Sequence, residues 1–259
     1  MTDRTKAVIP VHFAGLAADI DAFAAITRDT GVPVIYDAAH AVGAQYNGSP
    51  TGGAGRASCY SFQSNKNMTC LGEGGAVTTD DEQFAEVVRR KKTFGFIYGA
   101  TPRVVDIGFN YRMTKAQYAV GVSQLAKIDR VIALRQERMA RMDGLLGDVG
   151  EIILPAGHGP GHGSHLYVIR VDTSKVDFTR DAFRQHLKDA HGVGTVVHYP
   201  AVWSWEAFAE LGYSEETADC PIAATACRQV LSLPIFPQTP MEDLDYIAWA
   251  VKQSIADLR

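Results

Sequence analysis

The stretch KAVIPVHFAGLAADIDAFAAITRDTGVPVIYD, residues 6–37, predicts the fold class of this chain. It opens and closes with short apolar runs, KAVIPVHF and VPVIYD, which we interpret as buried strands. The intervening DIDAFAAITRDTG carries apolar residues at helical spacing and ends at Gly31, a typical helix stop. A strand, a helix and a strand within about 30 residues form a βαβ unit, whose two strands run parallel. We therefore expect an α/β fold.

Composition and charge exclude several classes of protein. The 259 residues are 46% hydrophobic and 21% charged, with a net charge of −4, which is typical of a globular protein with one or two domains. Because there is no basic excess, no nucleic-acid partner is expected. No apolar run approaches the roughly 20 residues that cross a bilayer, and the amino end, MTDRTKAVIP, lacks the apolar core of a signal peptide. We expect a cytoplasmic protein without a membrane partner.

Neither the cysteines nor the histidines are spaced as metal ligands. The four cysteines show no CxxC or Cys/His pattern typical of zinc, and we interpret them as reduced thiols: Cys59, Cys70, Cys220 and Cys227. His158 and His162 lie in the glycine-rich loop AGHGPGHGSH, and no carboxylate is expected near them. The sequence therefore predicts no metal site.

The rest of the chain falls into two parts. RASCYSF and GGAVTTD predict further strands, DDEQFAEVVRRKKTFG an amphipathic helix, and the segment from Thr114 a long helix with a break near Ile128. The Pro/Gly/His segment 155–163 is the best linker candidate. Beyond it, HLYVIRVD predicts a strand, GTVVHYP a strand leading into a loop, DFTRDAFRQHLKDAHGV and TPMEDLDYIAWAVKQSIADL helices, and CPIAATACRQVLSLPIF a helix and a short strand. We expect residues 1–150 to form a large domain with a mostly parallel sheet flanked by helices, and residues 151–259 to form a small α+β domain.

Two residues that follow predicted strands suggest a chemistry. Asp37 closes VPVIYD, and a carboxylate at the carboxyl end of a parallel strand lies where open α/β sheets place ligands. Lys66 lies in a Ser/Asn/Gly-rich loop, whereas lysine stems ordinarily lie along a helix or a rim. Taken alone, Asp37 is more simply a turn cap and Lys66 a surface residue. Together they are the pair that a pyridoxal phosphate (PLP) site needs, an amine for the Schiff base and a carboxylate that keeps the pyridine nitrogen protonated.

Small residues around this pair leave room for a flat cofactor. Ser61, five residues before Lys66, could bind the cofactor phosphate, although a serine at a strand end is more often a turn former. His40, three residues after Asp37, could touch the ring, although by itself it is more simply a hydrogen-bonded core histidine. The GEGG run is a weak phosphate signal. A desolvated Lys66 would have a lowered pKa, which nucleophilic attack and proton transfer require.

Seven motifs occur in the order seen in the DegT/DnrJ/StrS sugar aminotransferases, which the chain resembles over nearly its whole length: TKAVIPVH, GVPVIYDAAHAVGA, CYSFQSNKN…GEGGAVTT, GFNYRMTKAQYAVGVSQL, HLYVIRV, GVGTVVHYP and VLSLPIFP. The resemblance implies a fold-type I PLP enzyme. It implies that Lys66 is the Schiff-base lysine and that Asp37 is the partner of the pyridine nitrogen. It further implies His40 as a cofactor contact and Ser61 as a phosphate ligand.

The same resemblance implies a dimer. Asn110 of GFNYRM is similar to the asparagine that reaches the phosphate of the neighbouring subunit's cofactor, so a homodimer with shared active sites is expected. Four further residues lie in motifs near the substrate mouth and are carried over as substrate-binding candidates: Arg112, His165, His198 and Tyr199.

The family also implies a reaction. Some related enzymes dehydrate sugars and carry a histidine in place of the lysine, so Lys66 favours transamination. An amino-acid donor, most often glutamate in this family, would convert the cofactor to pyridoxamine phosphate. This form would then aminate a keto group on a nucleotide-linked sugar. An enzyme acting on an amino acid is the weaker alternative, because no arginine is obviously placed as a carboxylate clamp; Arg170 lies inside a predicted strand.

Family members carry a segment before TKAVIPVH that binds the cofactor phosphate at a helix N-terminus and supplies early strands of the large sheet. Because the present chain begins almost at that motif, we expect its large domain to be N-terminally truncated. The alternative function is therefore that of a truncated, non-catalytic relative that acts as a binding or regulatory module. The presence of both Lys66 and Asp37 argues for the enzyme.

Overall fold

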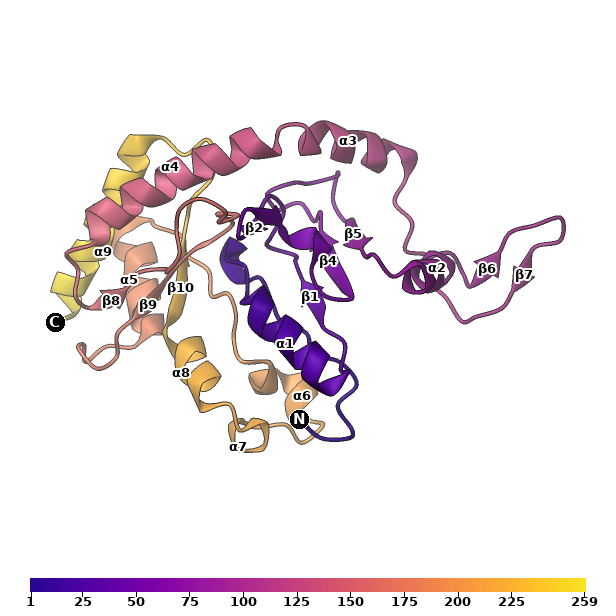
Figure 1. Cartoon of the computed structure of the whole chain (residues 1–259). Coiled ribbons are helices and arrows are strands. Elements are labelled where there is room, and N and C mark those ends of the chain that lie inside the picture. Colours follow the sequence, from indigo (N-terminus) through magenta and orange to yellow (C-terminus); the bar gives the residue numbers. More distant parts are fainter. The chain divides into compact units, whose positions relative to one another are not determined.

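The computed structural model describes residues 1–259, and packing divides the chain into two compact units whose elements are labelled in Figure 1. The first unit consists of residues 1–132 with 159–165, and the second consists of residues 133–158 with 166–259. The predicted division of the chain at residue 150, into a cofactor-binding domain and a small domain, stays a prediction. No helix of the chain is both long enough and apolar enough to cross a membrane.

A three-stranded sheet in the first unit positions the candidate residues (Figure 1). β1 (Ile35–Asp37) pairs in parallel with β4 (Ala57–Ser61), and Asp37 lies opposite Cys59. β5 (Gly75–Thr78) pairs with the other side of β4 in the antiparallel direction. All three strands lie where the sequence predicts them, which confirms the α/β class and adds an antiparallel edge to the expected parallel sheet.

The first predicted strand, KAVIPVHF, forms only in part. Val8 and Val11 make isolated parallel bridges beside β1. Pro10, which lies between them, has no N–H to donate, although its carbonyl accepts the N–H of Asp37 at 2.9 Å. The segment therefore runs parallel to β1 without becoming a regular strand, as the βαβ prediction requires.

The helix of this βαβ unit, α1 (Ile20–Thr30), begins and ends as its sequence predicts. The Asp19 carboxylate accepts a first-turn N–H at 3.0 Å, and Gly31 after the last turn adopts a φ of 70°, which glycine takes without strain. Phe23 packs edge-on against Tyr36 of β1, with ring centroids 6.3 Å apart. This contact holds α1 against the sheet.

Two hairpins in the first unit are not predicted by the sequence. β2 (Gln45–Tyr46) pairs with β3 (Ser49–Pro50), and β6 (Phe96–Ile97) pairs with β7 (Arg103–Val104). Strands of two residues are too short to show an alternating pattern. The predicted amphipathic helix is confirmed as α2 (Glu82–Lys91), with acidic residues at its start and basic residues at its end.

The predicted long helix with a break forms as α3 (Lys115–Leu125) and α4 (Ile128–Leu146). Thr114 and Gln117 make a capping box at the start of α3, which explains why the helix begins there. The first turns of α4 belong to the first unit, where Ile132 packs into a small apolar cluster. The remainder of α4 belongs to the second unit.

An antiparallel sheet in the order β10–β9–β8 organises the second unit. Its elements after α4 are β8 (Ile152–Ile153), β9 (Tyr167–Val171), α5 (Arg180–His191), α6 (Glu206–Ala209), α7 (Glu215–Ala218), α8 (Pro221–Gln229), β10 (Val230–Leu233) and α9 (Met241–Leu258). Phe183 and Leu187 of α5 and Leu244 of α9 are fully buried in one apolar core with the strands. The predicted helix-and-sheet pattern of this part is therefore formed.

The segment GTVVHYP, predicted as a strand leading into a loop, forms the loop but no regular strand. Only Val196 makes an antiparallel bridge, to Ser232 of β10. The segment continues into the loop that carries His198 and Tyr199, and Pro200 at its end has no N–H for a sheet.

Candidate active site

Asp37 lies at the carboxyl end of β1, the edge at which open α/β sheets bind ligands. The neighbouring extended segment fixes its backbone, since the Asp37 carbonyl accepts the N–H of His12 at 3.0 Å. Its Oδ1 accepts the N–H of Ala39 at 2.9 Å, whereas Oδ2 makes no hydrogen bond. One carboxylate oxygen is thus held in place and the other is available to a ligand.

Lys66 lies in the loop between β4 and β5 and is half-buried. A turn positions it, in which its backbone N–H donates to the carbonyl of Gln63 at 2.9 Å. Burial lowers the pKa of the Lys66 ammonium, and the negative charge of Asp37 opposes this shift. Because the effect of burial is the larger, more of the amine is neutral and nucleophilic at a given pH than in an exposed lysine.

A buried network links the lysine loop to a pair of histidines. His40 accepts the N–H of Ala14 at its Nδ1 over 3.3 Å, and its ring centroid lies 4.5 Å from that of His165. The Nδ1 atom of His165 lies 3.1 Å from Oδ1 of Asn67, the residue after the lysine. Asn67 also donates from Nδ2 to the carbonyl of Gly163 at 2.5 Å. The structure therefore brings His40, His165 and the lysine loop together.

His12 belongs to this site but is not singled out by sequence reasoning. It is fully buried, stacks on Tyr36 with centroids 4.7 Å apart, and accepts the N–H of Ala18 at its Nδ1 over 3.0 Å. Burial lowers the pKa of His12, and Asp37 opposes the shift. The one available signal is a histidine inside an apolar, strand-like run. For Asn67, the available signal is that an amide side chain directly follows Lys66.

Ser61 ends β4 at the same edge of the sheet as Asp37, because β1 and β4 are parallel. Its Oγ accepts the N–H of Gln63, the residue that also forms the turn at Lys66, over 3.3 Å. The hydroxyl hydrogen remains able to donate to an anion. The predicted role of Ser61 as a phosphate ligand stays a prediction.

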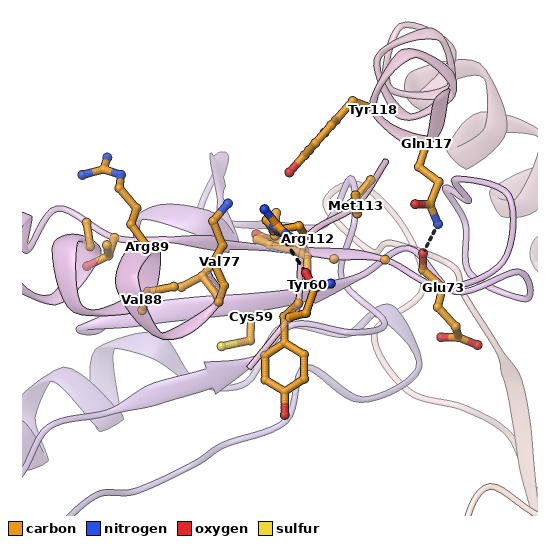
Figure 2. A pocket seen from close by; sticks show the side chains of 18 residues that line it. Cys59, Tyr60, Glu73, Val77, Val88, Arg89, Arg112, Met113, Gln117 and Tyr118 are labelled. Carbon is orange, nitrogen blue, oxygen red and sulfur yellow. Dashed lines mark hydrogen bonds between the residues drawn. The ribbon is translucent and has the colours of Figure 1, made fainter. Parts of the chain in front are cut away.

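Asn110 and Arg112 lie at a different place in the first unit. Arg112 donates from Nε to Oδ1 of Asn110 at 2.9 Å, and its guanidinium lies 5.1 Å from the ring centroid of Phe94. Both line a pocket of about 710 Å³ bounded by β5 and by residues of α2 and α3, shown in Figure 2. Lys66, Asp37 and His40 do not line this pocket. Asn110 and Arg112 thus line a pocket to which Lys66 does not contribute.

His198 and Tyr199 belong to the second unit. His198 Nδ1 lies 2.8 Å from Oγ of Ser232 on β10, and its ring meets that of Tyr199 edge-on with centroids 5.0 Å apart. The β10 strand therefore orients His198. Their predicted contact with substrate stays a prediction.

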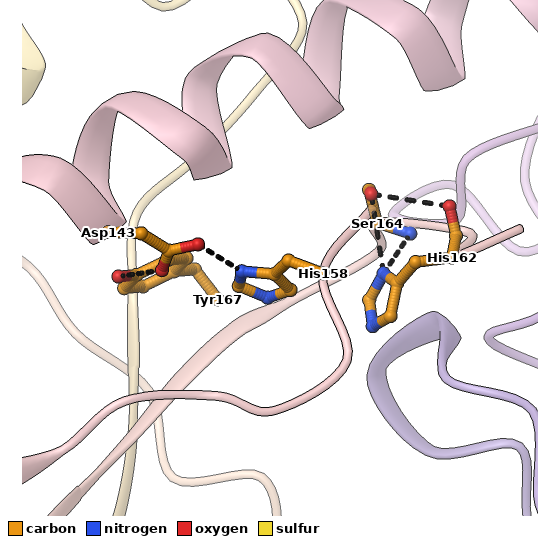
Figure 3. A network of polar contacts seen from close by, with 5 residues as sticks. All are labelled: Asp143, His158, His162, Ser164 and Tyr167. Carbon is orange, nitrogen blue, oxygen red and sulfur yellow. Dashed lines mark hydrogen bonds and ion pairs between the residues drawn. The ribbon is translucent and has the colours of Figure 1, made fainter. Parts of the chain in front are cut away.

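The glycine-rich loop holds two separate histidine contacts (Figure 3). In the second unit, Asp143 of α4 accepts from Tyr167 at 2.8 Å and lies 2.7 Å from Nδ1 of His158. Burial and the Asp143 carboxylate raise the pKa of Tyr167. In the first unit, His162 Nδ1 accepts the N–H of Ser164 at 2.8 Å. The expectation that no carboxylate lies near these histidines is wrong for His158, because folding brings α4 beside the loop.

Comparison with known proteins yields a consistent set of relatives. The family model for the DegT/DnrJ/EryC1/StrS aminotransferases matches residues 1–252. The spore coat polysaccharide biosynthesis protein SpsC of Bacillus subtilis (strain 168) is 36% identical over 267 aligned positions, which cover 98% of this chain and 68% of SpsC.

Solved structures agree with this result. The chain is similar to DesV of S. venezuelae, solved in complex with a ketimine intermediate, with a TM-score of 0.86 and 34% identity over 98% of this chain and 66% of DesV. The PLP form of Spr1654 from Streptococcus pneumoniae gives a TM-score of 0.88 at 23% identity, over 100% of this chain and 70% of Spr1654, which supports the fold alone. The chain belongs to the DegT/DnrJ/EryC1/StrS aminotransferase family.

Proposed function

We propose that this chain uses pyridoxal phosphate to transfer an amino group to a keto sugar linked to a nucleotide. The amino donor is an amino acid, for which glutamate is the first choice, and the product serves amino-sugar biosynthesis. The observation that carries this proposal is the pairing of a half-buried Lys66, whose pKa is lowered, with Asp37 at the carboxyl end of β1. The coat-polysaccharide role in the name of SpsC supports the sugar substrate.

The residues present fit this cofactor. Oδ2 of Asp37 has no hydrogen-bond partner and can hold a protonated pyridine nitrogen. Ser61, at the same edge of the sheet, offers a hydroxyl to a phosphate, and the buried His40 offers an aromatic face. Pyridoxal phosphate, when bound, supplies a ring that withdraws electrons from the carbon whose proton is moved.

Lys66 and Asp37 have separate tasks in this proposal. The Nζ atom of Lys66, with its lowered pKa, is the nucleophile to which the cofactor attaches, and it later accepts and returns a proton. The carboxylate of Asp37 would provide a fixed negative charge for the protonated pyridine nitrogen. Asn67 and His165 hold the lysine loop in place through their 3.1 Å contact.

We further propose a homodimer in the cytoplasm with shared active sites. In this arrangement Asn110 serves the partner's cofactor phosphate, which agrees with its position at a pocket that excludes Lys66. Exposed apolar side chains near this pocket, including Ile107 at 84% and Tyr111 at 70% exposure, are candidates for burial between subunits. Arg112, His165, His198 and Tyr199 are proposed to contact substrate. The four free thiols agree with a reducing compartment.

The first test is reaction of the purified chain with pyridoxal phosphate. We expect a visible absorbance band that borohydride removes, and mass analysis should then find the reduced adduct on the Lys66 peptide. Lys66→Ala should lose the adduct, whereas Lys127→Ala, a control at an exposed turn lysine, should keep it. An adduct that persists in Lys66→Ala would assign the attachment to another amine. No adduct in the wild type would favour the binding-only relative.

The second test addresses the substrates. With the cofactor-loaded chain, glutamate and a panel of nucleotide-linked keto sugars, we expect 2-oxoglutarate and an aminated sugar nucleotide in equal amounts. If 2-oxoglutarate forms once per active site and then stops with every keto sugar, the donor half is right and the acceptor class is wrong. If free keto acids accept the amino group better than the keto sugars do, the enzyme would instead be assigned to amino-acid metabolism.

A further inference from the structure

Three potential metal ligands converge in the second unit, and none of them belongs to the proposed cofactor site. His186 and His191 lie on α5, and Asp257 lies in the last turn of α9. Each offers one ligand atom, and the three atoms all lie within 4.8 Å of one another. α5 and α9 pack against each other in the core of this unit, so the cluster bridges two helices that are already fixed.

One pair of ligand atoms already has the spacing of a metal site. Nε2 of His186 lies 3.6 Å from Oδ2 of Asp257. Two ligands of a tetrahedral zinc ion with bonds of about 2.0–2.2 Å are separated by roughly 3.3–3.6 Å. The third ligand atom lies within 4.8 Å of these two and would move closer to them when an ion binds.

Outer contacts orient two of the ligands. Nδ1 of His186 lies 3.1 Å from Oγ of Ser254, which is fully buried, so Nε2 is the nitrogen that faces Asp257. Oδ1 of Asp257 accepts from Nε2 of Gln253 at 2.8 Å, which leaves Oδ2 for a cation. Ligands in natural metal sites are held by such contacts at the atom that does not bind the metal.

His191 completes the cluster. It is the last residue of α5, and the carboxyl end of a helix favours positive charge. Its ring packs edge-on against Trp249, with centroids 5.1 Å apart, which limits its rotation. Its Nε2 atom is buried and has no hydrogen-bond partner, so this imidazole is available to a metal ion.

We propose that His186, His191 and Asp257 bind a divalent transition-metal ion, for which zinc is the best fit. Two imidazoles and one carboxylate are a donor set that zinc accepts, and they leave a fourth position for water or for a group from another molecule. The bound ion would cross-link α5 to the end of α9 and stabilise the folded second unit. The proposal does not depend on the proposed function. It revises the prediction of no metal site, which considered only ligands close together in the sequence.

The test is metal binding by the full chain after treatment with a chelator and without pyridoxal phosphate. Zinc chloride is titrated against a chromophoric competitor, and cobalt(II) is used as a spectroscopic probe. We expect one zinc ion per chain, a visible cobalt band typical of tetrahedral coordination, and loss of that band on zinc addition. The melting temperature should rise with zinc.

Variants identify the ligands. Asp257→Asn alters an exposed side chain and should leave the fold intact while weakening zinc binding by about tenfold or more. His186→Gln should have the same effect. Ser254→Ala should also weaken zinc binding, because Ser254 orients the ring of His186 without binding the metal itself. Asp189→Asn changes another exposed carboxylate, which lies on α5 with the two histidines. This variant is the matched control and should bind zinc as tightly as the wild type does. Unchanged affinity in both Asp257→Asn and His186→Gln, or no cobalt band in the wild type, would overturn the proposal.

Discussion

Lys66 experiences two opposed effects, and their balance determines its reactivity. Burial disfavours the ammonium, and the Asp37 carboxylate favours it, with burial the larger. Lys66 therefore has the negative charge of Asp37 nearby but does not form a permanent ion pair with it. Its side chain is therefore suited to a cycle in which the same nitrogen is alternately a nucleophile, a base and an acid.

Asp37→Asn should lower the pKa of Lys66 further, because it removes the charge that raises this pKa while leaving the burial unchanged. The check is competitive labelling of the chain, without cofactor, by an amine-reactive reagent over a range of pH, with the Lys66 peptide quantified by mass spectrometry. Its midpoint should move to lower pH, and the Lys127 peptide should not change. A midpoint that stays or rises would show that Asp37 is not close enough to act on Lys66.

His12 should make the first unit sensitive to acid. Its pKa is lowered from the ordinary value of 6.5 by burial, so the unfolded chain binds a proton more readily than the folded one. Stability should therefore fall as the pH drops below about 6.5, with a slope of up to about 1.4 kcal/mol per pH unit. Protonation of Nδ1 would also break its hydrogen bond from Ala18.

The measurement for His12 is hydrogen exchange of the β1 amides at several pH values, corrected for intrinsic exchange. His12→Phe keeps an aromatic ring against Tyr36 and removes the titration, so its β1 protection should depend less on pH than in the wild type. The β9 amides of the second unit provide an internal control. Equal pH dependence in wild type and variant would assign the acid sensitivity to another group.

At the scale of elements, the helices are the best-encoded parts of this chain. α1, α3 and α5 each begin at a side-chain cap, Asp19, Thr114 and Thr179 respectively, and the caps are visible in the sequence. The strands are short, and several are formed by pairing with partners far along the chain. Packing therefore contributes more to the strands than local preference does.

Leu187→Ala should destabilise the second unit by about 2–5 kcal/mol, because this α5 side chain is completely buried and its loss leaves a cavity. Leu211→Ala, at a position that is 73% exposed, is the matched control and should change stability by less than about 0.5 kcal/mol. Urea unfolding followed by tryptophan fluorescence suits this test, since all three tryptophans belong to the second unit. Similar losses in the two variants would contradict the assigned core.

At the scale of the whole molecule, the residues of the proposed active site do not all line one pocket of a single chain. Asn110 lines a pocket that contains neither Lys66 nor Asp37, although the proposed function requires all three residues. A symmetric dimer resolves this difficulty, because each chain then contributes the lysine to one site and the asparagine to the other.

Mixing two inactive variants tests this arrangement. Lys66→Ala and Asn110→Ala, unfolded together and refolded, should regain about a quarter of the wild-type activity, because half of the dimers are mixed and each has one intact site. Either variant refolded alone should stay inactive. Mixed dimers that form, as judged by co-purification through a tag on one chain, yet show no activity would place both residues in the same subunit's site.

The sequence by itself determined the α/β class, the βαβ unit, the end of its helix at Gly31, the start of the long helix at Thr114, and the candidates Asp37 and Lys66. These features are local, because helical spacing, helix ends and strand ends depend on residues that are close together in the sequence. Tertiary structure alone decided that His165 meets Asn67, that His158 pairs with Asp143, and that Asp257 joins His186. Each of these contacts joins residues that are separated in the sequence. A local sequence pattern does not predict which distant side chains will come into contact. The energy that selects such pairs comes from the packing of several elements at once, which exists only in the folded protein.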